Sequence, residues 1–229
     1  MKVLAFDTSN KAMSIALLED ETLLAEMTLN IKKNHSISLM PSIDFLMAQV
    51  GLTPKDLERI VVAKGPGSYT GLRVAVATAK TLAYTLKIDV VGVSSLAAIA
   101  LNAKQNGLVV PIIDARRQNV YAGFYRHGQS VKSDQHMSFS DVLASLTDED
   151  DVSIVGEVDA FYETIKESLP KAKILAVLPS AYEIGKLGLT LPAETVDFFV
   201  PEYLKRVEAE ENWLKTHELT NEDDFIKRV

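Results

Sequence analysis

Apolar runs and helical patterns follow one another along the chain in an order that occurs twice: three strands, then helix, strand, helix, strand and helix. In the first half we predict strands at residues 3–7, 13–18, 23–29, 59–64 and 90–93. Helices are predicted at residues 39–50, 71–86 and 96–105. Thr53-Pro54 is an N-cap followed by a first-turn proline, which predicts a further short helix.

The second half repeats this element order without visible sequence identity. Strands are predicted at residues 108–114, 120–125, 130–137, 152–155 and 173–178. Helices are predicted after Ser140 as a cap and at residues 160–169 and 182–189. The pattern indicates an α/β protein with an N-terminal lobe at 1–104, a C-terminal lobe at 105–205 and an exposed helical tail at 206–229.

Composition removes several function classes. The 229 residues include no cysteine, which excludes disulfides, thiolate catalysis and cysteine-ligated metals. The four histidines form no i, i+4 pair, so a zinc protease is not indicated. The net charge is −7 and the basic residues are scattered, so we do not expect the chain to act alone on nucleic acid. No apolar run is long enough for a membrane span and no leader pattern opens the chain, so we expect a cytoplasmic protein with no membrane contact.

The glycine-rich loop at residues 65–73 is the strongest local candidate for a binding site. It lies between a predicted strand and a predicted helix, where backbone N–H groups and a helix N-terminus favour an anion. The candidate phosphate-contacting residues are Gly65, Gly67, Ser68, Tyr69, Thr70, Gly71 and Arg73. The loop is neither a P-loop nor a Rossmann fingerprint, and a tight turn capped by Ser68 or Thr70 explains it equally well.

Two aspartates occupy matching places in the two halves. Asp7 and Asp114 each end the first strand of a lobe and precede a hairpin. In a two-lobed fold such residues would face one another across a cleft and could hold a metal–phosphate complex. Alternatively, each carboxylate caps its own turn.

The first long helix carries more apolar surface than one core-facing stripe requires. We assign Leu39, Ile43, Leu46 and Val50 to that stripe and place Met40, Phe45 and Met47 off it. The alanine-rich helix that follows residue 71 permits close packing. A two-helix core is the plain alternative, but exposed methionine and phenylalanine favour a partner-facing surface. Its candidate residues are Met40, Ile43, Phe45, Met47, Ala75, Ala79 and Leu82.

Four segments together resemble the TsaB (YeaZ) family, and the resemblance extends to about Lys205. They are residues 4–9 (LAFDTS), 65–73 (GPGSYTGLR), 114–121 (DARRQNVY) and 201–204 (PEYL). Family members typically have Phe where Tyr69 stands and Arg where Lys205 stands. The resemblance implies the actin-like ATPase fold (ASKHA, RNase H-like) with two similar β-β-β-α-β-α lobes.

The resemblance also implies a function. The family resembles TsaD (Kae1), which transfers a threonylcarbamoyl group to the adenosine beside the anticodon of certain tRNAs. TsaD uses a metal held by two histidines four residues apart, and the matching positions here are Ser95 and Ile99. Neither replaces an imidazole ligand, so we expect no metal, no cofactor and no catalysis.

The resemblance also implies binding partners for this chain. They are a TsaD-like catalytic subunit, a TsaE-like ATPase and, for the chain alone, a second copy, with tRNA reached only through the complex. A small ATP-dependent kinase or phosphotransferase of the same fold is the main alternative, although the second half lacks a Gly-Gly-type adenosine loop. A dormant glycoprotease is a third possibility, which the missing metal ligands disfavour.

Overall fold

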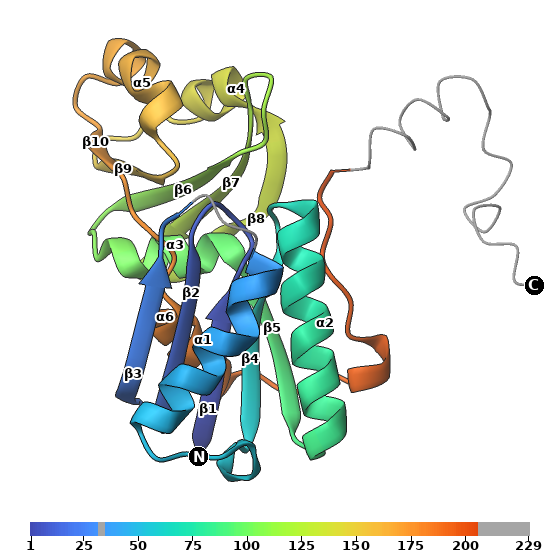
Figure 1. Cartoon of the computed structure of the whole chain (residues 1–229). Coiled ribbons are helices and arrows are strands. Elements are labelled where there is room, and N and C mark those ends of the chain that lie inside the picture. Colours follow the sequence, from blue (N-terminus) through green and yellow to red (C-terminus); the bar gives the residue numbers. More distant parts are fainter. Residues whose placement is uncertain (32–34, 206–229) are drawn as a thin grey trace, which may run out of the picture.

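Each half of the chain forms a five-stranded mixed sheet, and helices cover both sheets (Figure 1). The computed structural model describes residues 1–31 and 35–205. The first sheet has the strand order β3-β2-β1-β4-β5 and the second has the order β10-β9-β6-β7-β8. In both sheets the first three strands are antiparallel and the last two join in parallel.

The elements follow the predicted order. The first half contains β1 (Lys2–Asp7), β2 (Met13–Glu19), β3 (Thr22–Leu29), α1 (His35–Gln49), η1 (Pro54–Asp56), β4 (Arg59–Gly65), α2 (Tyr69–Leu86), β5 (Asp89–Ser94) and α3 (Ser95–Ala103). The second contains β6 (Leu108–Asp114), β7 (Asn119–Arg126), β8 (Gln129–Ser138), α4 (Phe139–Ala144), β9 (Val152–Gly156), η2 (Asp159–Phe161), α5 (Tyr162–Ser168), β10 (Lys173–Leu175), α6 (Ala181–Thr190) and η3 (Val196–Phe198). This repeated topology is that of the actin-like fold, which confirms the predicted fold class.

The two faces of each sheet are buried against different helices. In the first lobe α1 and α2 pack on one face through a core that includes Leu4, Phe6 and Ile60. The other face, with Val3, Ala5, Val61 and their neighbours, packs against α6. Helix α3 packs on strands of the second sheet, β6, β7 and β9. The last helix of each half therefore covers the sheet of the other half.

The segment that follows α6 also returns to the first lobe. Phe199 is 1% exposed within the core of α1 and α2. Glu194 forms an antiparallel bridge with Val90 on the edge strand β5 and pairs with Lys64 at 2.9 Å. This segment thus lies along the β5 edge of the first sheet, although it follows the second lobe in sequence.

Several predicted boundaries need correction. Ser138, not Ser140, caps α4, because its Oγ accepts the Asp141 N–H at 3.1 Å and Ser140 already lies in the first turn. The predicted helix at 160–169 is divided into η2 and α5, and the predicted strand at 173–178 ends at Leu175. The predicted tail at 206–229, with its helix around Trp213, lies outside the described residues.

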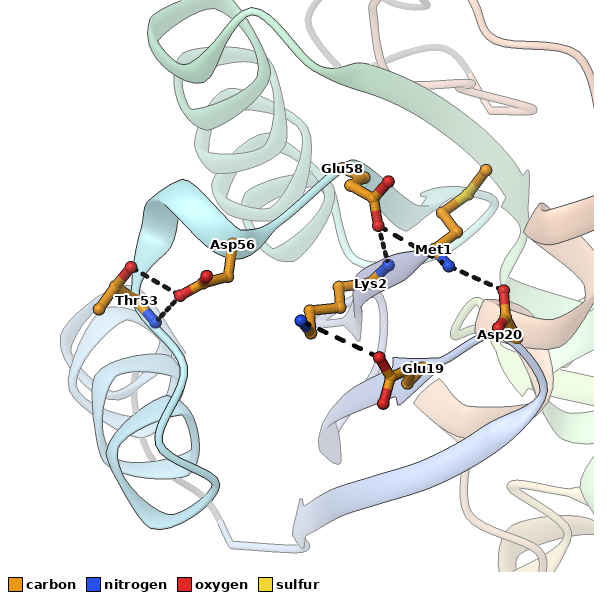
Figure 2. Close-up of polar contacts among 7 residues, drawn as sticks. All are labelled: Met1, Lys2, Glu19, Asp20, Thr53, Asp56 and Glu58. Carbon is orange, nitrogen blue, oxygen red and sulfur yellow. Dashed lines mark hydrogen bonds and ion pairs between the residues drawn. The ribbon is translucent and has the colours of Figure 1, made fainter.

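A group of polar contacts joins the first residues of β1 to the turn after β2 and the loop before β4 (Figure 2). The amino group of Met1 lies 2.8 Å from Asp20, and Lys2 donates its backbone N–H to Glu58 at 2.6 Å. Beside them the Asp56 carboxylate accepts the N–H and the hydroxyl of Thr53, both at 2.7 Å. These hydrogen bonds lower the Asp56 pKa, and they cap the N-terminal end of the predicted short helix η1. Among the described residues, none of the helices combines the length and apolar character needed to cross a membrane.

Candidate functional site

The glycines of the loop between β4 and α2 allow three chain segments to touch through their backbones. A Cβ added to Gly67 or Gly71 would lie closer than 3.0 Å to a carbonyl oxygen of the β1–β2 turn, that of Ser9 or Thr8 respectively. A Cβ added to Gly65 would similarly collide with the carbonyl of Glu202. Close packing therefore explains the glycines without a ligand.

Some of the loop's backbone groups already form hydrogen bonds to the β1–β2 turn and are not free to bind a ligand. Ser68 donates its backbone N–H to the Ser9 carbonyl at 2.6 Å, and the Thr8 hydroxyl donates to the Gly71 carbonyl at 2.7 Å. The Ser68 Oγ accepts the Gly71 N–H at 3.4 Å and so caps α2. The capped turn is thus present, and phosphate contact by this loop stays a prediction.

Tyr69 and Arg73 contact the segment that follows α6. The Arg73 guanidinium lies 4.1 Å from the centre of the Tyr69 ring, and its Nε donates to the Tyr203 hydroxyl at 3.2 Å. The two tyrosine rings lie 5.0 Å apart. This exposed stack joins the first turn of α2 to residues 201–204, two of the segments that carry the family resemblance.

A cavity of about 670 Å³ lies between the lobes, and several predicted site residues meet there. Residues 67–70 line it from the first lobe, and Asp114 lines it from the second. Lys11 and Arg116, which we did not single out from the sequence as cleft residues, line the same cavity. Lys11 was signalled only by its place in the turn after the first strand, and Arg116 by its place in the segment 114–121 that carries the family resemblance.

Asp7 does not face this cavity as predicted. It is fully buried, whereas Asp114 is exposed. Each carboxylate instead accepts a backbone N–H two residues ahead, from Ser9 at 2.6 Å and from Arg116 at 2.7 Å. Burial raises the Asp7 pKa to about 6, although hydrogen bonds from Ser9 act in the other direction. Both aspartates therefore cap their own turns, which was the alternative interpretation.

The two positions that the family resemblance matches to the metal ligands of TsaD are packed into the protein interior. Ser95 is 0% exposed and Ile99 is 1% exposed. Ile99 belongs to the apolar cluster between α3 and the second sheet, with Val109, Val155 and their neighbours. Within residues 1–31 and 35–205 no group of three or more His, Asp or Glu side chains is placed to hold a metal ion.

The candidate partner surface is partly where the sequence predicted it. Met40 is 46% exposed and Phe45 is 52% exposed, as expected. The placement of Met47 off the core stripe is wrong, because this side chain is only 5% exposed and packs in the core of the first lobe. Other predicted interface residues are also turned toward the core: Ile43 is 4% exposed, Ala75 and Ala79 are 0% exposed, and Leu82 is half-buried.

Two exposed aromatic residues beside these helices were missed. Tyr84 near the end of α2 is 71% exposed, and Phe198 in η3 is 82% exposed. Tyr84 lies in an apolar pattern that also suits a buried position. Phe198 could be placed only once the return of its segment to the first lobe was known.

Comparison with known proteins identifies relatives along most of the chain. The family model described as TsaD, tRNA N6-adenosine threonylcarbamoyltransferase, matches residues 22–213. The "tRNA threonylcarbamoyladenosine biosynthesis protein TsaB" of Bacillus subtilis is 39% identical over 227 residues, which covers 94% of this chain and 99% of that protein. The Escherichia coli protein of the same name is 32% identical over 133 residues, 57% of each chain.

A solved structure has the same fold. It is "YeaZ from Pseudomonas aeruginosa", which is 27% identical, has a TM-score of 0.76 and is matched over 89% of this chain and 99% of its own. Sequence identity across nearly the whole length and the shared two-lobed fold lead to one assignment. This chain belongs to the TsaB (YeaZ) family.

Proposed function

We propose that the chain is a non-catalytic subunit in the biosynthesis of threonylcarbamoyladenosine in tRNA, where it binds and supports a TsaD-like catalytic subunit. The pathway in this proposal is taken from the names of the relatives in Bacillus subtilis and Escherichia coli. The TsaD family match over residues 22–213 supports a partner of related fold.

The observation that carries the proposal is the apolar surface of α1. Ile37, Met40 and Phe45 are 72%, 46% and 52% exposed, while Leu39, Ile43, Leu46 and Met47 supply the core-facing stripe. Several large apolar side chains exposed on one helix indicate a protein-binding surface.

The neighbouring helix α2 extends this surface. Of its 18 residues only Arg73 and Lys80 are charged. Its exposed positions include Ala77, Thr81 and Tyr84, which a partner helix can approach closely at little desolvation cost. The pair α1–α2 therefore suits a four-helix contact with a related subunit. A second copy of this chain would use the same face in an isologous dimer and compete with the catalytic subunit.

The absence of catalysis in the proposal rests on Ser95 and Ile99. Both are enclosed in packed interior where TsaD carries its ligand pair, and neither side chain offers an imidazole nitrogen. The complex would reach tRNA through the catalytic subunit, recruit a TsaE-like ATPase and work in the cytoplasm.

The test uses Met40→Asp with Phe45→Asp in the full chain. Both positions are about half exposed, so the fold should survive while the proposed interface gains two unpaired charges. The matched control is Val131→Asp with Tyr162→Asp, which changes two exposed residues of the second lobe, 55% and 43% exposed, by the same charge.

Size-exclusion chromatography, a pull-down with the TsaD-like subunit and a reconstituted tRNA modification assay supply the readouts. We expect the α1 variant to stay folded, remain monomeric, lose the partner and fail to support modification, while the control behaves as wild type. A folded α1 variant that still binds the partner and supports full modification would place the interface elsewhere.

A further inference from the structure

Asp44 places a negative charge in the exposed apolar face of α1. The helix contains no other Asp, Glu, Lys or Arg. Helical geometry puts Asp44 between Met40 and Phe45 and on the same side as Ile37, two turns earlier, and all four side chains are exposed. Among the described residues the Asp44 carboxylate has no hydrogen-bond or ion-pair partner. A protein that covers the exposed apolar residues of α1 therefore also covers this charge.

The effect of this carboxylate on binding depends on what the partner places opposite it. A carboxylate that loses its water without gaining a counter-charge opposes association. A lysine or arginine of the partner at hydrogen-bond distance instead makes the same group favourable to binding. A single charge in an apolar face therefore distinguishes partners that present a cation from partners that do not.

A second copy of this chain is poorly suited to face Asp44. In an isologous contact through α1 and α2, the facing residues come from the same two helices, whose basic side chains are His35, Arg73 and Lys80. Arg73 donates to a tyrosine hydroxyl of the segment after α6 at 3.2 Å, and Lys80 donates to a backbone carbonyl of η3 at 2.7 Å. His35 Nε2 lies 2.9 Å from a carbonyl oxygen of the β1–β2 turn. The cations of these two helices are thus already engaged within their own chain.

We infer that Asp44 selects the partner of the α1–α2 surface, favouring a subunit that presents a lysine or arginine opposite α1 over a second copy of this chain. The cationic subunit gains an ion pair with Asp44, whereas a homodimer covers two carboxylates and supplies no free cation from the same helices. This role rests on the proposed function, in which the α1–α2 surface binds the TsaD-like subunit. Asp44 then makes the homodimer the weaker of the two competing assemblies.

Asp44→Asn in the full chain tests this selection, because it removes the charge and keeps the size of an exposed side chain. We expect the affinity for the TsaD-like subunit to fall severalfold and the affinity of the homodimer to rise severalfold. In the wild type, added salt should weaken the first contact and strengthen the second, and the variant should lose both responses. Asp44→Lys should weaken binding to the TsaD-like subunit about tenfold or more through repulsion between like charges. Calorimetry with the purified TsaD-like subunit and sedimentation equilibrium of the chain alone, each at low and high salt, measure the two affinities.

The matched control is Glu167→Gln, which neutralises an exposed carboxylate on α5 in the second lobe and should leave both affinities and their salt dependence unaltered. If Met40→Asp with Phe45→Asp abolishes both contacts but a folded Asp44→Asn protein lacks either expected shift, the selective role of Asp44 is overturned and the interface stands. If the Met40 and Phe45 variant also binds the TsaD-like subunit as wild type does, the proposed interface fails and the role of Asp44 fails with it.

Discussion

The close contact between Gly71 and the β1–β2 turn predicts that a substitution which normally stabilises a helix will destabilise this protein. Gly71→Ala adds a methyl group much closer than 3.0 Å to the Thr8 carbonyl oxygen. Alanine in place of glycine contributes up to about 1 kcal/mol of helix stability. Against this, overpacking costs about 1–3 kcal/mol. The bonds from Thr8 to Gly71 and from Ser68 to Ser9 would each lose about 1 kcal/mol. The net expectation is a loss of about 2–4 kcal/mol, or about 5–15 °C in Tm.

The control is the reverse substitution in the same helix. Ala77→Gly is exposed on α2 and should cost only about 1 kcal/mol through helix propensity. Urea denaturation followed by circular dichroism measures both variants and reports any change in the m-value. A Gly71→Ala protein as stable as wild type, or more stable, would show that the glycine is not required by packing and would favour the phosphate interpretation of the loop.

Other predictions address charge, core and ligand. Asp7→Asn should stabilise the protein by up to about 3 kcal/mol at pH 7, because burial raises the Asp7 pKa from 3.8 to about 6. A raised carboxyl pKa means that wild-type stability falls as pH rises from about 4 to about 6, and the variant should lose that slope in denaturation curves. Met47→Asp should unfold the protein or cost several kcal/mol in the same assay, in contrast to Met40→Asp. Calorimetry with ATP and magnesium should detect at most weak binding, and micromolar affinity with steady hydrolysis would favour the kinase alternative. Elemental analysis should find no stoichiometric transition metal, and one zinc or iron per chain would contradict the argument from Ser95 and Ile99.

The order of the elements could be predicted because each strand is a short apolar run closed by a turn signal. The cavity between the lobes brings together residues 67–70 and Asp114, which the sequence had offered as two separate candidates. The burial of Asp7 could not be predicted, because the β1–β2 turn is covered by a loop distant in sequence. The hydrogen bond from the Thr8 hydroxyl to the Gly71 carbonyl joins positions 63 residues apart.

The wrong placement of Met47 has a different cause. It lies four residues after Ile43 and eight after Leu39, so helical spacing alone places it on the core stripe. The exposed Met40 and Phe45 were identified correctly because they depart from that spacing. The exchange of α3 and α6 between the sheets had no local signal, since both helices are apolar enough to be buried against either one.

Contacts between the two lobes bear on how the lobes work together. Ser94, at the start of α3, donates its hydroxyl to Asp134 of β8 and is joined by the Tyr125 hydroxyl at 3.3 Å. Tyr125 also donates to Asp134 at 3.2 Å, so the network connects the first lobe to two strands of the second. Helices exchanged between the sheets add apolar contacts across the same boundary. A closure of the two lobes around a ligand would have to preserve or rearrange these contacts. Helices α1 and α2 pack on the first sheet through a buried core, so a partner can bind their exposed face without a large ordering cost. The packing of α1 and α2 on the first sheet, together with the contacts between the lobes, therefore supports the proposed binding role of these two helices.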